Sequence, residues 1–301
     1  MTQLPHPVTG ERFPSPVPAG SGWPGDPSRA DTPVALNPGS VAELAARADS
    51  TGTVSAAVSV CRACPRLVAW REQVAVEKRA SFAHEPYWGR PIAGWGSDQP
   101  LVLVVGLAPA ANGGNRTGRI FTGDRSGDWL FAALHRVGLA SRPTSEHAGD
   151  GQRLVGTRML AAVRCAPPAN KPTPAERDTC APWLDAELRL VLASVRAVVC
   201  LGSFGWDSVW RALGRLGYDV PRPRPRFRHG AQVSLADPAD TGRQVVVLGC
   251  YHPSQQNTFT GTLTEPMLDA VLGAAASCAS SPSAPSAPSA QRSDGAAVGT
   301  T

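Results

Sequence analysis

Four short apolar runs, separated by segments with helical patterns, constrain the fold of this chain more than any other feature. The runs are LVLVV (101–105), TRMLAAVR (157–164), RAVVCL (196–201) and VVVLGC (245–250). They are mostly apolar and do not alternate with polar residues, as expected of strands that are covered on both faces. Alternating strands and helices predict an open α/β sheet with helices on both sides. Ligands bind such sheets beyond the carboxyl ends of the strands, so the four loops that follow the runs should converge on one site.

The two ends of the chain have a different composition from the middle. Residues 1–39 and 278–301 are rich in Pro, Gly, Ser and Ala and lack periodic apolar residues, so we expect both to be disordered. Residues 40–277 would then form one domain. No apolar stretch is long enough to span a bilayer and no signal peptide is visible, which predicts a cytoplasmic protein with no membrane partner.

Charge gives a modest indication of an anionic partner. The 301-residue chain has a net charge of +5, carried mostly by Arg. Residues 221–229, PRPRPRFRH, which we call the Pro-Arg arm, should be extended and semi-rigid. The arm fits the neutralisation of phosphates and a merely solvated excursion equally well.

The loop after the first run, GLAPAANGGNRTGRIFTGD (106–124), does not match the known phosphate-binding loops. Gly113 and Gly118 have the glycine spacing of a Walker loop, but Arg119 and Ile120 stand where that loop has Lys and a hydroxyl residue. No Gly-x-Gly-x-x-Gly is present either. A nucleotide-cofactor site is therefore disfavoured.

Four of the seven cysteines form a candidate metal site. Cys61 and Cys64 are a CxxC pair, and Cys165 and Cys180 lie just after the second run and in the following helix. Four thiolates can hold zinc or an iron–sulfur cluster, and the spacing does not choose between them. The other three are expected to be inert, Cys200 and Cys250 in the core and Cys278 at the edge of the tail.

The segment HPSQQNT (252–258) follows the last run. His252 stands at the carboxyl end of a predicted strand inside a polar loop, which favours a functional role. His135 and His229 lack that context, and we expect them to be structural.

Together these residues resemble the uracil-DNA glycosylase superfamily, specifically its iron–sulfur family 5 (type B). The motifs are the loop 106–124, CAPPANKPTP (165–174), HPSQQNT and the four-Cys spacing, and the resemblance covers residues from about 61 to 265. It implies a three-layer α/β/α sandwich with a four-stranded, mostly parallel sheet. It also implies a structural [4Fe–4S] cluster bound by Cys61, Cys64, Cys165 and Cys180.

The reaction that the resemblance implies is monofunctional base excision. A glycosylase flips its target nucleotide out of double-stranded DNA into a tight pocket, hydrolyses the N-glycosidic bond and leaves an abasic site. Asp124 would orient water and stabilise the sugar cation, His252 would donate to the base carbonyl, and Asn170 would help to hold the water. Asp124 could instead cap the helix that begins near Ser126, and Asn170 could instead be a turn former.

The resemblance also implies a base pocket and a DNA-contacting loop. Phe121 would stack on the flipped base, with a core anchor as its alternative role. The pocket would be formed by Gly106, Ala108, Pro109, Ala110, Asn115 and Phe121, with glycines that let the main chain approach the base. Residues of the 252–258 segment would press on the duplex: Ser254, Gln255, Gln256 and Asn257.

One departure from related branches bears on specificity. Where those branches carry an Asn that reads uracil, this chain has Leu201-Gly202-Ser203-Phe204. We therefore expect excision of hypoxanthine, ethenocytosine and hydroxymethyluracil besides uracil. We also expect the protein to be a monomer and to act in base-excision repair. Two alternatives remain: a non-catalytic DNA-binding module with zinc, and a nucleotide-metabolising α/β enzyme.

Overall fold

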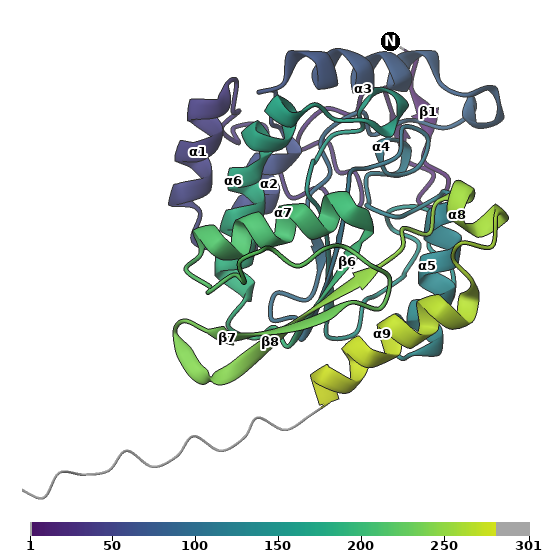
Figure 1. The fold of residues 1–301 in the computed structure, drawn as a ribbon. Coiled ribbons are helices and arrows are strands. Elements are labelled where there is room, and N and C mark those ends of the chain that lie inside the picture. Colours follow the sequence, from purple (N-terminus) through teal and green to yellow (C-terminus); the bar gives the residue numbers. More distant parts are fainter. Residues whose placement is uncertain (1, 281–301) are drawn as a thin grey trace, which may run out of the picture.

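A six-stranded sheet lies at the centre of the computed structural model, which describes residues 2–280 (Figure 1). The strand order is β3-β5-β4-β6-β8-β7, and β5, β4, β6 and β8 are parallel. The parallel strands overlap with the four predicted runs: β4 (Val102–Gly106), β5 (Thr157–Ala161), β6 (Ala197–Leu201) and β8 (Asp240–Cys250). The two-residue β3 (Trp95–Gly96) and β7 (Gln232–Asp237) add antiparallel edges that the four-stranded prediction did not include.

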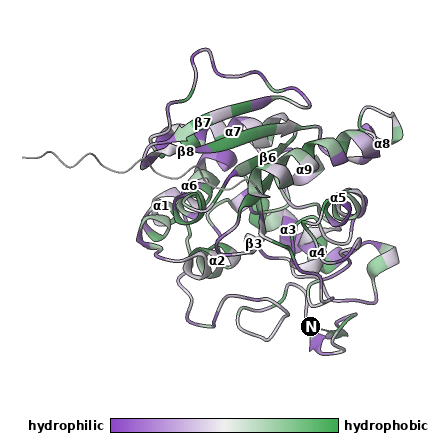
Figure 2. Cartoon of the chain, turned by 90° about the horizontal axis from the view of Figure 1, so that it is seen from below, coloured by the Kyte–Doolittle hydropathy of each residue, from purple (hydrophilic) through white to green (hydrophobic). Residues whose placement is uncertain are grey.

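Both faces of the sheet are covered by helices, which confirms the predicted α/β/α sandwich. Val102 and Val104 of β4 face the core beneath α5 (Arg125–Arg136) and α9 (Glu265–Ser280). Leu103 and Val105 face the opposite core, beneath α6 (Pro174–Val191) and α7 (Gly202–Arg215). Hydrophobic residues accordingly gather in the strands between the two helical layers (Figure 2). Burial on both faces is the reason that these strands are apolar without alternation.

The remaining helices are short or lie outside the sandwich. α1 (Pro38–Arg47) and α2 (Thr51–Ser59) pack against α6. Asn37 caps α1, and Ser40 occupies the third helical position and completes a capping box. The other elements are α3 (Pro65–Glu77), η1 (Ala80–Phe82), α4 (Gly114–Thr117), η2 (Pro168–Asn170) and α8 (Gln255–Phe259).

The N-terminal segment is ordered, contrary to the expectation that residues 1–39 are disordered. β1 (Leu4–Pro5) pairs with β2 (Arg12–Phe13). Phe13, Val17 and Trp23 are buried in the same core as α5 and α9. These anchors bury enough apolar surface to fix a segment that has little regular structure of its own.

The C-terminal boundary also differs from the prediction. α9 continues to Ser280, so residues 278–280, which were assigned to a disordered tail, are helical. The rest of the predicted tail, 281–301, lies outside the described residues. Among residues 2–280, no helix combines the length and the apolar character needed to cross a membrane.

Candidate active site

The four loops that leave the parallel strands meet at one cavity, as the strand order predicted. The cavity lies at the carboxyl ends of β4, β5, β6 and β8. Its lining comes from every one of these loops: Leu107, Ala108, Ala110, Ile120, Phe121, Asp124, Arg125, Ser126, Ala169, Asn170, Leu201, Gly202, Ser203, Phe204, His252, Ser254, Gln255 and Gln256. We call it the catalytic cavity, after the role that we propose for it.

Phe121 lies on the wall of this cavity in an unusual backbone conformation. Its φ is +52°, a region that few residues other than glycine adopt. The ring is largely buried, belongs to the core cluster and lies 6.0 Å from the His252 ring, measured between centroids. Phe121 therefore lies at the boundary between the core and the cavity.

The glycines of the loop make room for the loop's own side chains. A Cβ atom on Gly106 would lie 2.5 Å from Cζ of Phe121, so any side chain there would collide with the ring. A Cβ atom on Gly113 would overlap the Asp124 carboxylate. Gly106 and Gly113 therefore leave space for the Phe121 ring and the Asp124 carboxylate. The expectation that the glycines let the main chain approach the base is wrong at these two positions.

Asp124 caps a helix and lines the cavity at the same time. It is the N-cap of α5, and its Oδ1 accepts a hydrogen bond of 3.0 Å from the Gly127 amide. Asp124 is thus the cap of this helix, as its alternative role predicted. Burial raises the pKa of the Asp124 carboxyl, while the amides of Gly127 and Ser126 and the charge of Arg116 oppose that rise. The helix N-terminus also favours a negative charge at this position.

His252 faces Phe121 from the loop after β8. Burial lowers the pKa of His252 to about 4, so the ring is neutral at pH 7. Its Nδ1 is buried and has no hydrogen-bond partner among the described residues. A neutral imidazole keeps one N–H donor and can offer it to a ligand in the cavity.

Asn170 reaches the cavity from a strained turn. Ala169 and Asn170 are consecutive non-glycine residues with positive φ, +52° and +56°, in η2. Asn170 is exposed and lines the catalytic cavity from the loop after β5. Asn170 therefore lies in a turn, as its alternative role predicted, and also on the wall of the cavity.

The structure divides the other predicted pocket residues into two groups. Ala108 and Ala110 line the catalytic cavity. Gly106 and Pro109 are buried behind its wall. Asn115 is fully buried, donates to the Arg71 carbonyl over 3.1 Å and lines no cavity described here, so its assignment to the base pocket was wrong.

The 252–258 loop also contains residues of two kinds. Gln255 and Gln256 are exposed on the rim of the catalytic cavity. Ser254 caps α8, and Asn257 donates from Nδ2 to the His252 carbonyl over 2.8 Å. Asn257 thus fixes the loop that carries His252, while the two glutamines are free to meet a ligand.

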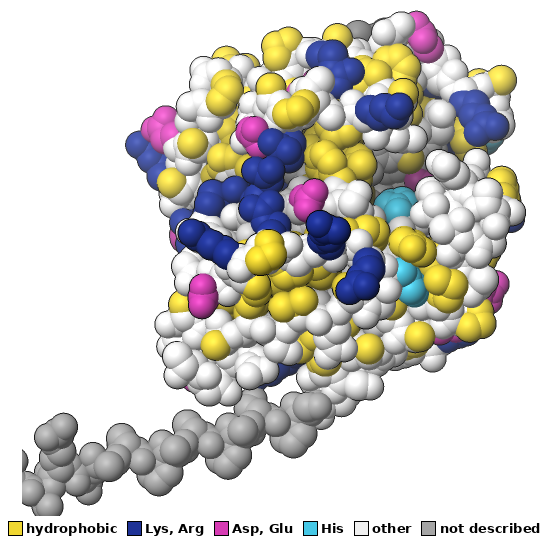
Figure 3. Space-filling model, viewed as in Figure 1, with side chains coloured by type: hydrophobic (Ala, Val, Ile, Leu, Met, Phe, Trp, Pro, Cys, Tyr) yellow, Lys and Arg dark blue, Asp and Glu magenta, His cyan; other side chains and the backbone are white. Residues whose placement is uncertain are grey.

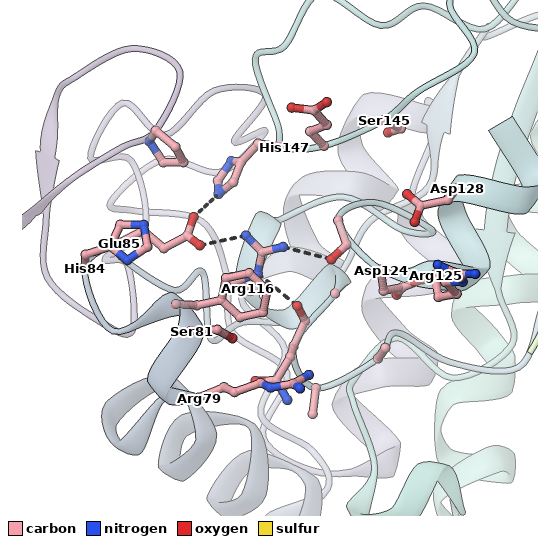
Figure 4. A pocket seen from close by; sticks show the side chains of 18 of the residues that line it. Arg79, Ser81, His84, Glu85, Arg116, Asp124, Arg125, Asp128, Ser145 and His147 are labelled. Carbon is pink, nitrogen blue, oxygen red and sulfur yellow. Dashed lines mark hydrogen bonds and ion pairs between the residues drawn. The ribbon is translucent and has the colours of Figure 1, made fainter. Parts of the chain in front are cut away.

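A second cavity adjoins the first on the far side of Asp124 (Figure 4). Its wall contains a buried network that sequence reasoning missed: Arg116 pairs with Glu85 over 2.9 Å and donates to the Gly123 carbonyl over 2.8 Å. The rings of His147 and His6, the latter from the N-terminal segment, lie 4.3 Å apart behind Glu85. Arg116 thereby fixes the backbone immediately before Asp124.

The four predicted metal-site cysteines surround a third, small cavity. Cys61 and Cys64 lie between α2 and α3, Cys165 follows β5, and Cys180 lies within α6. In the part of the chain that the structure describes, no three His, Cys, Asp or Glu side chains are grouped tightly enough to hold a metal ion.

Donors directed at the sulfurs fit an iron–sulfur cluster in this cavity. Arg71 is buried and donates from Nη1 to Cys165 Sγ over 2.9 Å, and the Arg164 amide donates to Cys180 Sγ over 3.4 Å. The Nε of Arg71 is buried without a partner. Hydrogen bonds to the sulfurs are a feature of protein-bound clusters. Cys200 and Cys250, by contrast, are fully buried at the ends of β6 and β8, as expected of core residues.

Comparison with known proteins gives a consistent result. The profile of the Uracil DNA glycosylase superfamily matches residues 93–275. The type-5 uracil-DNA glycosylase of Mycobacterium tuberculosis is 57% identical over 270 residues, which are 90% of this chain and 97% of the relative. The type-5 enzyme of Mycobacterium leprae is 58% identical over 76% of this chain and 95% of its own length. That of Thermus thermophilus is 48% identical over 71% of this chain and 92% of its own length.

Proposed function

The chain belongs to the uracil-DNA glycosylase superfamily, and from this we propose that it is an enzyme that excises uracil from DNA. The reaction is hydrolysis of the N-glycosidic bond, which leaves an abasic site for base-excision repair. The observation that carries the proposal is that Phe121, Asp124, Asn170 and His252 line one cavity. The two alternatives, a zinc-containing binding module and a nucleotide-metabolising enzyme, have no comparable support from the relatives.

The charges of the reaction fit the two ionisable groups in the cavity. Cleavage of the bond places positive charge on the sugar and negative charge on the departing base. We infer that the Asp124 carboxylate orients the attacking water and stabilises the sugar cation. The neutral His252 donates a hydrogen bond to the base carbonyl, and Asn170 helps to hold the water. Phe121 stacks on the flipped base, which its position between the core and the cavity supports.

The lining of the cavity supports a broad substrate range. Leu201, Gly202, Ser203 and Phe204 line it where an amide side chain would read uracil, and none of them is an amide. We infer that hypoxanthine, ethenocytosine and hydroxymethyluracil in double-stranded DNA are also substrates. Comparing excision rates on matched oligonucleotides tests this inference, and a strict preference for uracil would contradict it.

We also infer a [4Fe–4S] cluster held by Cys61, Cys64, Cys165 and Cys180. The four cysteines line one cavity, and donors from Arg71 and Arg164 point at two of their sulfurs. When bound, such a cluster would tie α3, α6 and the loop after β5 together, a structural role. Ala108, from the loop after β4, packs against the buried side chains of Leu67, Val163 and Cys165.

The proposed function is tested by incubating the protein with a uracil-containing duplex and cleaving any abasic site with alkali. Strand cleavage at the uracil position is expected for the wild-type chain and not for a matched duplex with thymine. A duplex left intact by protein that still carries its cluster would overturn the proposal.

A further inference from the structure

The Pro-Arg arm presents a row of unpaired positive charge. Its arginines, Arg222, Arg224, Arg226 and Arg228, are all exposed. Within residues 2–280 none of their guanidinium groups forms an ion pair, whereas five other exposed arginines have acidic partners: Arg47, Arg62, Arg66, Arg136 and Arg215. Arg222 and Arg224 line a hollow beside α7, together with Arg211 of that helix. Because these four guanidinium groups have no acidic partner within the described residues, they are available to bind an anionic ligand.

The arm is held rigidly along the side of the fold. The indole N–H of Trp206 in α7 donates to the Pro225 carbonyl over 2.8 Å. The Phe227 ring packs against the rings of Trp206 and Tyr251, with centroids 6.1 and 6.0 Å away. Proline at 221, 223 and 225 restricts the backbone further. Little conformational entropy would be lost when a ligand binds the arm.

The end of the arm lies next to the catalytic cavity. His229 accepts a hydrogen bond of 3.1 Å from the Tyr251 amide, and Tyr251 precedes His252 in the chain. Figure 3 shows Lys and Arg side chains in a band across this face, which ends beside two His side chains and a hollow. The arm from Arg222 to Arg228 contains a cis peptide bond at Pro223 and, at about 3.1 Å per residue, spans at most roughly 19 Å. That length corresponds to about five or six phosphates of one DNA strand at ~3.4 Å each along the helix axis.

We propose that the Pro-Arg arm binds the phosphate backbone of duplex DNA beside the lesion, outside the catalytic cavity. The proposal rests on the proposed function, because it takes the DNA in the cavity as the ligand that extends over the arm. Guanidinium groups suit phosphate oxygens, and contacts of this kind position a duplex without reading its sequence. The arm therefore contributes to affinity for any duplex and leaves the choice of base to the cavity.

The test compares two fourfold variants of the full chain that carry the same charge. One replaces the arm, R222Q/R224Q/R226Q/R228Q. The control removes four exposed arginines elsewhere, R12Q/R29Q/R47Q/R153Q. Equilibrium binding to a 30-base-pair duplex without a lesion is measured as a function of salt concentration. Each lost phosphate contact lowers the slope of log K against log salt by about 0.9, so the arm variant should lose up to ~3.6.

The control variant should keep a slope close to that of the wild type, because its arginines lie outside the arm. Single-turnover excision at saturating enzyme should be the same in all three proteins, since no substituted residue lines the catalytic cavity. A hydroxyl-radical footprint on a uracil duplex should lose protection on one side of the lesion only in the arm variant. Equal slopes in the two variants would overturn the proposal. Wild-type protein that binds lesion-free DNA but excises nothing would instead overturn the proposed function, and the slope comparison would still decide the role of the arm.

Discussion

Replacing Gly106 with Ala tests whether the Phe121 ring occupies the space that a side chain at position 106 would need. The added Cβ would lie 2.5 Å from Phe121 Cζ, while carbon atoms in contact are normally about 3.5 to 4.0 Å apart. The tip of the ring must therefore move by about 1 Å. Gly106 is a strand residue without positive φ, so its backbone conformation accepts Ala. We expect Gly106→Ala to lower the free energy of unfolding by about 1–3 kcal/mol.

A double-mutant cycle isolates the collision with the ring. Phe121→Leu removes the ring tip, so adding Gly106→Ala to that variant should cost close to nothing, and the coupling energy should equal the cost measured in the wild type. Urea unfolding supplies the four free energies. Single-turnover excision of uracil by Gly106→Ala should fall by up to ~100-fold, because displacements of about 1 Å at a reacting centre have that effect.

Gly273→Ala is the matched control. Gly273 lies in α9, and the nearest atom to its added Cβ would be 4.0 Å away, an ordinary contact. This substitution should leave excision unchanged and stabilise the protein by up to about 1 kcal/mol through helix propensity. If Gly106→Ala costs the same with Phe and with Leu at 121, the ring is not what excludes a side chain, and the explanation of this glycine is refuted.

Three further predictions concern the carboxylate, the buried histidines and the cysteines. Asp124→Asn should retain duplex binding and, because Asn is a good N-cap, stability, but lose excision by roughly 10²- to 10⁴-fold; full activity would remove Asp124 from the chemistry. Burial lowers the pKa of His147 to about 3. Between pH 6.5 and that value, His147 is protonated in the unfolded chain and neutral in the folded chain. The free energy of unfolding should thus fall as the pH drops from 6.5 towards 4, and urea titrations should show a shallower fall in His147→Gln but not in His135→Gln, whose ring is on an exposed residue. Purified protein should be brown, with a visible absorbance that Cys180→Ser loses and Cys200→Ser keeps; a colourless wild type would contradict the cluster.

Fully buried strands were the easiest part of the fold to predict. β4, β5, β6 and the second half of β8 are covered on both faces, and the resulting apolar runs are visible in the sequence. β7 was missed because it is an edge strand whose exposed and buried residues alternate, so it has no apolar run. The N-terminal segment was misjudged because its anchors, Phe13, Val17 and Trp23, follow no helical or strand period among prolines and glycines.

The candidate site was predictable where its residues lie in recognisable loops that follow the parallel strands. Phe121 and Asp124 belong to one recognisable loop, and His252 and Asn170 follow strands that end at the same edge. The network of Arg116, Glu85 and His147 joins three segments that only the folded chain brings together, so no local pattern reveals it. Asn115 shows the converse: it stands in the right loop, but its side chain faces the interior.

The double use of Asp124 ties chemistry to local order. One oxygen of its carboxylate accepts from the Gly127 amide at the start of α5, so the carboxylate that we propose as catalytic keeps its position only while that helical turn is formed. Ends of helices open far more readily than whole domains unfold. On warming, excision would then stop when the first turn of α5 frays, at a temperature at which the sheet, the cysteine cavity and the Pro-Arg arm are still folded.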